Sequence, residues 1–278
     1  AHLHLLIWVD RRHVMLCIRG CSECVNGFCQ RFGEEIGSEA LDNGEDSLIV
    51  GRDSRLHSPL FAEYLIRGIL STGCNVINIG TVPTPLMYFG TETLATTRSG
   101  VMVTASHNPK EWNGFKMVAV GKTREPEQIK ALRTRMVEGK FYNGIGQEQS
   151  TDVSAAYIDA IFSDVALAGD MSIVIDAGHG ATGKIGPQLF EELGCDVTSL
   201  HCDLDGNFPN HGPDPSNEAN LQSLISKVKE IEADLGVAFD GDGDRITVIT
   251  SSGEIIWADR LMMLFANDIL ARNPGADV

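Results

Sequence analysis

Residues 100–116 read GVMVTASHNPKEWNGFK, an apolar run that is followed at once by a polar loop containing Ser106. The apolar run has the β-branched character of a buried strand, and open α/β sheets bind their ligands at the carboxyl ends of such strands. His107, Asn108 and Lys116 supply hydrogen-bond donors that could hold an anion beside the serine hydroxyl. An ordinary polar loop capping a strand is the alternative for Ser106 taken alone.

Short β-branched runs alternate with helix-length amphipathic stretches on both sides of this loop. The predicted strands cover residues 47–51, 75–79, 100–104, 114–120, 172–176, 196–200, 234–239, 246–250 and 254–257. The predicted helices cover residues 58–71, 84–93, 126–138, 153–162, 184–193, 218–232 and 258–271. Strands separated by helices are typical of βαβ units and of mainly parallel sheets.

A stretch rich in Gly, Asn and Gln at residues 142–150 is the best candidate for a linker. We therefore expect two α/β domains, the first at residues 1–145 and the second at residues 146–250. One short strand pair and one helix do not close a core. Residues 251–278 are accordingly expected to begin a third domain that is cut short.

Residues 240–245 read DGDGDR and directly follow the apolar run LGVAF. Asp240, Asp242 and Asp244, called the aspartate trio below, stand at alternate positions and project to one side of an extended segment. Carboxylates this close repel one another unless a cation lies between them, and magnesium is the hard, oxygen-preferring ion that fits. An EF-hand is excluded because Arg245 stands where that loop needs glycine. A solvated acidic turn is the remaining alternative.

Residues 51–55 (GRDSR) also follow an apolar run, and they place two arginines close together. Arg52 and Arg55 could hold a phosphate or a neighbouring carboxylate through bidentate hydrogen bonds. The alternative is an arginine–aspartate pair that fixes the loop. The sequence leaves both open.

The formal net charge of −16 disfavours nucleic acid and anionic membranes as partners. A small phosphorylated substrate remains possible, because basic side chains and a cation can invert the potential locally. No apolar run approaches the roughly 18 residues of a membrane span, and no signal peptide is evident. These features predict a cytoplasmic protein.

The odd number of cysteines, 7, argues against a secreted disulfide framework. Cys21 and Cys24 have the spacing of a metal-binding knuckle, but no second pair follows downstream. We therefore favour free thiols over a zinc or iron–sulfur site.

The chain resembles the α-D-phosphohexomutase superfamily, and in particular its bacterial phosphomannomutase/phosphoglucomutase branch. The resemblance is carried by VGRDSR, VPTP, TASHNPKEWNGFK, DAGHG, PDPSNEANL and FDGDGDR. It runs from about residue 33 to the end, whereas residues 1–32 match only around residues 18–20 (IRG). It implies tandem three-layer α/β domains with mixed, mainly parallel sheets around a cleft. The family's third-domain sugar loop and its fourth domain are missing from this sequence.

The resemblance also implies site roles. Ser106 would carry the phosphoryl group, and the aspartate trio would hold Mg²⁺ against that phosphate. Arg245 would lie beside the phosphoserine, with His107 and Lys116 near the transferred group. Arg19 matches the arginine of the family's usual Tyr-Asp-Ile-Arg-Gly opening.

The implied activity interconverts hexose 1-phosphate and hexose 6-phosphate of mannose or glucose through a hexose 1,6-bisphosphate. The Trp112-Asn-Gly string favours hexose phosphates over the phosphoglucosamine mutase branch, which usually has Asp-Asn-Gly there. Three alternatives stay open: an incompetent fragment that binds Mg²⁺ and phosphosugar, a phosphoglucosamine mutase, and a metal-dependent phosphatase.

Overall fold

The computed structural model describes residues 4–10, 13–19, 22–124 and 126–277. Its first half consists of β1 (His4–Asp10), β2 (His13–Arg19), α1 (Ser22–Asp42), β3 (Ser47–Arg52), α2 (Ser58–Ser71), β4 (Asn75–Thr81), α3 (Thr84–Thr93), β5 (Gly100–Val103), β6 (Asn113–Ala119), β7 (Lys122–Thr123), α4 (Pro126–Glu138) and β8 (Glu148–Ser150). Its second half consists of α5 (Ser154–Asp164), β9 (Ser172–Asp176), α6 (Thr182–Glu192), β10 (Asp196–Leu200), the 3₁₀ helix η1 (Glu218–Leu221), α7 (Gln222–Glu230), β11 (Leu235–Phe239), β12 (Ile246–Thr250), β13 (Ile255–Ile256) and α8 (Ala258–Arg272).

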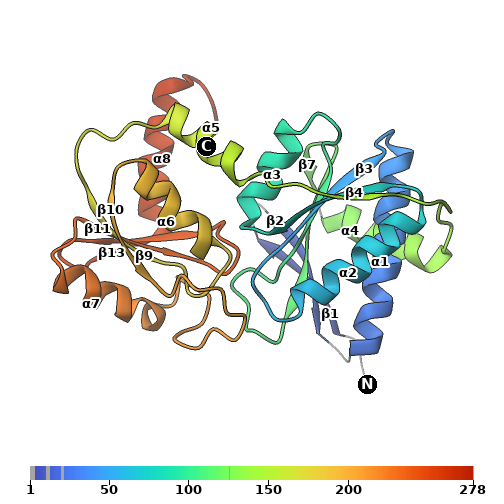
Figure 1. The fold of residues 1–278 in the computed structure, drawn as a ribbon, viewed down its shortest axis with the longest axis horizontal. Coiled ribbons are helices and arrows are strands. Elements are labelled where there is room, and N and C mark those ends of the chain that lie inside the picture. Colours follow the sequence, from blue (N-terminus) through green and yellow to red (C-terminus); the bar gives the residue numbers. More distant parts are fainter. Residues whose placement is uncertain (1–3, 11–12, 20–21, 125, 278) are drawn as a thin grey trace.

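Each half is built on one mixed sheet, and the two lie side by side in Figure 1. The first sheet runs β1-β2-β6-β5-β3-β4-β8, with β7 paired to β6, and the second runs β10-β9-β11-β12-β13. The strands joined through helices, such as β3 with β4 and β9 with β10, pair in parallel. Hairpins such as β1–β2 and β12–β13 add antiparallel pairs at the edges. The predicted α/β class with mixed sheets is confirmed. The expectation that the sheets are mainly parallel is wrong, because among the described strands five pairs are parallel and six are antiparallel, including β5–β6 and β11–β12 inside the sheets.

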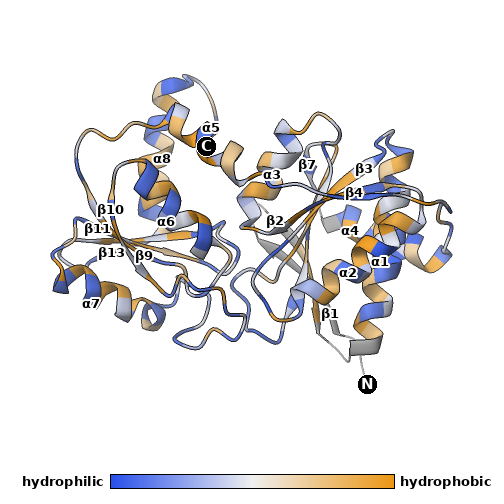
Figure 2. Cartoon of the chain, in the orientation of Figure 1, coloured by the Kyte–Doolittle hydropathy of each residue, from blue (hydrophilic) through white to orange (hydrophobic). Residues whose placement is uncertain are grey.

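The first sheet is the middle layer of three. Side chains alternate across β3, so that Leu48 and Val50 pack into the cluster under α1 and α2 while Ile49 packs on the opposite face with Leu86 and Met87 of α3. The strands appear as orange bands between helices with mixed colouring in Figure 2. Burial on both faces explains why these strands read as continuous apolar runs.

The second sheet repeats this arrangement. Val174 of β9 packs with Leu224 and Val228 of α7, whereas Ile173 and Ile175 pack on the other face, with Phe190 of α6. Strand β13 forms the edge of this sheet, although the sequence had assigned it to a third domain. Strand β13 has only two residues and cannot form a sheet by itself, so it pairs with β12 at the edge of the second sheet.

Helices α1 and α2 cross at very close range because two glycines meet there. A Cβ at Gly33 would lie 2.2 Å from the carbonyl oxygen of Leu65, and one at Gly68 would lie 2.0 Å from that of Gln30. Neither distance can accommodate a side chain, so both positions require glycine for packing.

Within the described ranges, none of the helices combines the length and the hydrophobicity that a membrane crossing needs. Cys21, one half of the knuckle spacing that is disfavoured above as a metal site, lies outside the described residues.

Candidate active site

Ser106 lies in the loop between β5 and β6, at the carboxyl end of β5 as predicted. Its backbone is in the left-handed region (φ 53°), an uncommon conformation for a residue with a side chain. The hydroxyl of Thr104 helps to hold this turn by accepting a hydrogen bond from the Ser106 N–H at 2.8 Å. The Ser106 hydroxyl is thereby aimed out of its own domain.

Arg55 holds the loop between β5 and β6, called the serine loop below, in its shape. Its Nε donates to Asp53 at 3.1 Å, and its terminal nitrogens donate to the carbonyl oxygens of Ser106, Asn108, Pro109 and Trp112. These partners use every N–H donor of the guanidinium, and the side chain is fully buried. No donor remains for a phosphate, so the geometry supports the loop-fixing alternative for Arg55.

The aspartate trio lies in the turn between β11 and β12. Asp240 and Asp242 are fully buried, and the candidate ligand oxygens of the trio lie within 4.8 Å of one another. Asp240 also accepts hydrogen bonds from the backbone N–H groups of Asp244 and Arg245, both at 3.1 Å. The sequence and the fold together therefore place three convergent oxygen donors in one turn, and this group could hold a metal ion.

The two loops meet across the domain boundary. The Ser106 hydroxyl donates to Oδ2 of Asp240 at 2.8 Å. Lys116 of β6 reaches the same turn, and its Nζ lies 2.7 Å from Asp242 and 2.5 Å from Asp244. The serine, the lysine and the trio thus form one buried cluster.

The charges in this cluster perturb one another strongly. Burial, together with the negative charges of Asp242 and Asp244, raises the pKa of Asp240 well above its ordinary range. Burial would also raise the pKa of Asp242, but the charge and hydrogen bond of Lys116 outweigh it and lower this pKa. Burial alone would lower the pKa of Lys116, whereas the trio raises it. A cation at the trio would relieve the repulsion that acts on Asp240.

Thr84 belongs to this cluster, although sequence reasoning gave it no role. It is the first residue of α3, its hydroxyl donates to Oδ2 of Asp242 at 2.5 Å, and its N–H donates to the Asp242 carbonyl oxygen at 2.8 Å. A helix N-terminus favours a carboxylate at this position. The sequence signal for Thr84 is the VPTP string at residues 82–85, which is part of the family resemblance.

Three further residues that the sequence predicted for the site are Asn108, Arg52 and Arg19. The side-chain amide of Asn108 donates to the Ala105 carbonyl oxygen at 3.0 Å and so shapes the serine loop. Arg52 lines a cavity of about 300 Å³ that also includes Pro59 and Glu63 of α2, away from Ser106. The backbone of Arg19 ends β2, and its side chain lies outside the described part of the chain. The binding roles of these residues stay predictions.

His107 and Arg245 interact electrostatically across the boundary. Burial lowers the pKa of His107 below its ordinary 6.5, and the charge of Arg245 lowers it further. The folded protein therefore disfavours the protonated imidazole, which the unfolded chain accepts at pH values below 6.5. As the pH falls below 6.5, this histidine accordingly lowers the free energy of unfolding.

We expect Arg245→Met to raise the pKa of His107, because one of the nearby positive charges is removed. NMR titration of the imidazole would measure the shift. Lys110→Met is the matched control, because Lys110 is an exposed cation of the same loop as His107 and its charge is not among the main causes of the lowered pKa of His107. An unchanged His107 titration in Arg245→Met would contradict the electrostatic interaction between these two residues.

The fold and the site define a class of α/β proteins in which a serine of one domain faces an acidic, metal-binding turn of the next. Two family profiles match the chain: "Phosphoglucomutase/phosphomannomutase, alpha/beta/alpha domain I" over residues 19–143 and "domain II" over residues 155–253. The chain belongs to this phosphoglucomutase/phosphomannomutase family of the phosphohexomutase superfamily.

Individual relatives agree with this assignment. The chain is 50% identical over 246 residues to the phosphomannomutase/phosphoglucomutase of Pseudomonas aeruginosa, a match that covers 88% of this chain and 53% of that protein. It is 45% identical over 248 residues to a phosphoglucomutase of Neisseria gonorrhoeae, covering 88% of this chain and 54% of that protein. The chain thus spans about half the length of the curated relatives it matches.

A crystal structure of a family protein from Burkholderia thailandensis superposes with a TM-score of 0.91 at 40% identity, covering 95% of this chain and 59% of that one. The arrangement of the two domains in Figure 1 is therefore shared with an experimentally determined relative.

Proposed function

We propose that this chain carries the phosphoserine and the metal site of a magnesium-dependent phosphohexomutase, which interconverts the 1- and 6-phosphates of a hexose. The observation that carries the proposal is the contact of 2.8 Å between the Ser106 hydroxyl and Asp240 of the trio. Two loops from separate domains meet there, so a phosphate on the serine and a cation on the trio would be adjacent. The names of the relatives support the same activity.

The residues fit Mg²⁺, because the trio offers only hard oxygen donors and its negative charges are crowded in a buried turn. When bound, the ion would supply positive charge against the phosphoryl oxygens. Lys116 would neutralise further charge on the same oxygens, and the backbone of the serine loop, held by Arg55, would keep the serine oxygen in position.

The proposed reaction begins with phosphorylated Ser106. The bond between phosphorus and the serine oxygen breaks as a free hydroxyl of the hexose phosphate forms a new bond to the phosphorus. The proton that this hydroxyl loses is gained, in the net reaction, by the serine oxygen, which becomes a hydroxyl again. The resulting hexose 1,6-bisphosphate turns around, and its other phosphate returns to Ser106. His107 and Arg245 lie at the loops that face this phosphate, where they would orient it.

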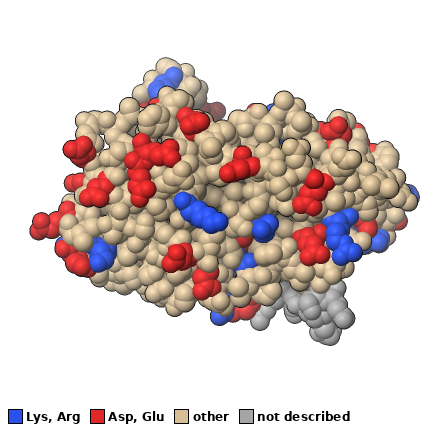
Figure 3. All heavy atoms as spheres, viewed as in Figure 1, with Lys and Arg blue, Asp and Glu red and all other residues tan. Residues whose placement is uncertain are grey.

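The proposed substrates are mannose and glucose phosphates, with hexose 1,6-bisphosphate as the intermediate. The Trp112-Asn-Gly string supports hexose over glucosamine phosphates. Figure 3 shows acidic side chains spread over one face, with basic side chains near its middle, where the two halves meet. Local basic groups of this kind favour a small anion despite the net charge of −16.

A coupled assay with glucose 1-phosphate, a trace of glucose 1,6-bisphosphate and Mg²⁺ tests the proposal. A mutase forms glucose 6-phosphate, whereas a phosphatase releases inorganic phosphate. A folded chain that binds Mg²⁺ and phosphosugar but yields neither product would favour the incompetent fragment.

Metal binding gives a separate prediction. We expect Asp242→Asn to weaken Mg²⁺ binding by roughly 10- to 100-fold, since it removes a charged oxygen donor from the trio. Isothermal titration calorimetry would measure the affinity. Asp205→Asn is the control, because Asp205 is an aspartate of the same domain whose carboxylate is hydrogen-bonded to Asn207 and is not part of the trio, and this variant should bind Mg²⁺ normally. Equal affinities for both variants would show that the ion binds elsewhere.

A further inference from the structure

A second group of potential metal ligands lies in the second domain, apart from the aspartate trio. Asp176 ends β9, His201 directly follows β10, and His211 lies in the loop at residues 203–216. Strands β9 and β10 pair in parallel with Leu200 opposite Asp176, so their carboxyl ends bring these residues together. One candidate ligand atom from each residue lies within 4.8 Å of the others.

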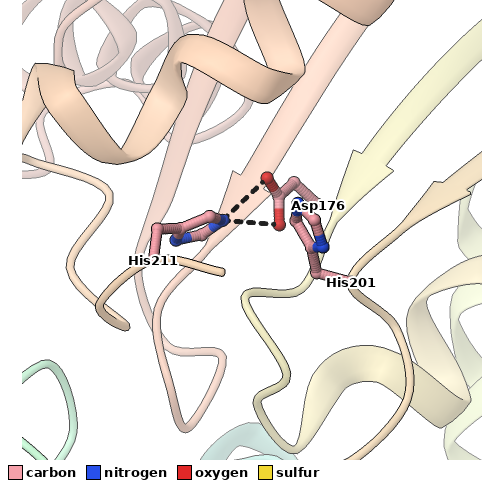
Figure 4. A group of neighbouring side chains, drawn as sticks. All are labelled: Asp176, His201 and His211. Atoms are coloured by element: carbon pink, nitrogen blue, oxygen red, sulfur yellow. Dashed lines mark hydrogen bonds and ion pairs between the residues drawn. The ribbon is translucent and has the colours of Figure 1, made fainter. Parts of the chain in front are cut away.

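The carboxylate of Asp176 lies between the two imidazoles, as Figure 4 shows. On one side, Nε2 of His211 is 3.0 Å from Oδ2 and 3.2 Å from Oδ1 of Asp176. On the other side, Nε2 of His201 is buried and makes no hydrogen bond within the described residues. The two rings stand edge to face with their centroids 5.2 Å apart.

The unsatisfied nitrogen of His201 is the feature that an internal ion pair does not explain. A buried imidazole nitrogen that lacks a partner is destabilising, whereas a neutral imidazole is a good metal ligand. Burial lowers the pKa of His201 and so favours the neutral ring. Asp176 is almost fully buried, so its negative charge also requires a partner.

We propose that Asp176, His201 and His211 bind one divalent transition-metal ion of the Zn²⁺ type. Two imidazole nitrogens and one carboxylate oxygen form a donor set that such ions prefer and that Mg²⁺ does not. The two metal sites of this chain would therefore differ in chemistry: oxygen donors at the trio, mixed nitrogen and oxygen donors here.

The consequence of binding is a link between three separate segments. The loop at residues 203–216 carries Pro213, whose carbonyl oxygen accepts a hydrogen bond from Gly241 within the aspartate turn at 3.2 Å. The same loop brings Gly206 close to Arg55 of the first domain. An ion at this site would fix the loop to the ends of β9 and β10 and so stabilise the surroundings of the trio.

The competing explanation is a metal-free latch, in which His211 and Asp176 simply form an ion pair. The two explanations differ at His201. A latch needs only His211 and Asp176, whereas a metal site needs His201 as well.

Calorimetric titration of the whole chain with Zn²⁺, in excess Mg²⁺ to occupy the trio, distinguishes them. We expect one Zn²⁺ per chain, and at least about tenfold weaker binding in both His201→Gln and His211→Gln. His57→Gln, which changes an exposed histidine of the first domain, should bind Zn²⁺ normally. Asp176→Asn is a further variant for the case in which one histidine variant does not fold, as judged by circular dichroism.

Substitution of Co²⁺ gives an independent readout, because its visible absorption depends on the number, type and geometry of its ligands, and this spectrum should change in His201→Gln. The proposal is overturned if the unchanged chain binds no Zn²⁺ in excess Mg²⁺, or if His201→Gln binds it as tightly as the unchanged chain. It is also overturned if Asp242→Asn abolishes Zn²⁺ binding. None of these results depends on mutase activity, so the proposed function can fail while this site stands.

Discussion

We expect Ser106→Ala to take up no phosphate from labelled glucose 1,6-bisphosphate, whereas the unchanged chain should become labelled. The expected loss of phosphoenzyme is at least about a thousandfold, because the variant lacks the hydroxyl oxygen that contacts Asp240 and would carry the phosphate. The backbone of the loop should keep its shape, since Arg55 holds it through carbonyl oxygens rather than through the serine side chain. Mass spectrometry of the intact chain and of its peptides would measure the label.

Ser54→Ala is the matched control for this experiment. The Ser54 hydroxyl also reaches across the boundary and donates to the carbonyl oxygen of His179 at 3.0 Å, but it does not contact the trio. We expect Ser54→Ala to become labelled almost normally. Normal labelling of Ser106→Ala would show that another residue accepts the phosphate.

We expect Arg55→Met to lower the free energy of unfolding by about 3–5 kcal/mol. Removing one partner of a buried ion pair leaves an uncompensated charge, here on Asp53, and several backbone carbonyl oxygens also lose their donor. Urea denaturation followed by circular dichroism would measure the change. The variant should also label poorly at Ser106, because the serine loop is no longer fixed.

Arg52→Met is the control, because it makes the same substitution three positions earlier. The Arg52 side chain is only partly buried and lines the cavity beside α2, so we expect a loss of about 1 kcal/mol or less. If the two variants were equally stable, the loop-fixing role of Arg55 would be wrong.

Much of the fold could be predicted because its local signals agree with its tertiary structure. The helix at residues 58–71 carries proline in its first turn, and α2 spans the same residues. The apolar runs at residues 172–176 and 196–200 correspond to β9 and β10. The interval predicted as one helix at residues 218–232 is instead divided into η1 and α7.

The N-terminal elements β1, β2 and α1 could not be predicted in this way. Helix α1 contains Gly27, Gly33 and Gly37, which lower helix propensity and hide its periodicity. At least Gly33 is needed for the close contact with α2, a requirement that only the tertiary structure reveals. Similarly, β8 at residues 148–150 was read as linker, because a short polar strand at a sheet edge has no apolar pattern.

The candidate site shows the same division. Ser106 and the trio could be singled out because each stands in a dense motif at the end of an apolar strand. The hydrogen bonds of Thr84 and of Arg55 depend on which loops meet in space. The roles of these two residues could therefore be seen only in the structure. The Asp176–His201–His211 group is also scattered over 36 positions of the sequence, counted from 176 to 211, and no motif links its members.

The central claim is that a phosphate on Ser106 and a metal ion on the aspartate trio are in direct contact. Electron–nuclear double resonance of the phosphorylated chain, with Mn²⁺ replacing Mg²⁺, measures that contact. We expect a phosphorus hyperfine coupling to Mn²⁺ that is absent from Ser106→Ala. Phosphorylated Ser106 together with trio-bound Mn²⁺ but no phosphorus coupling would contradict the account.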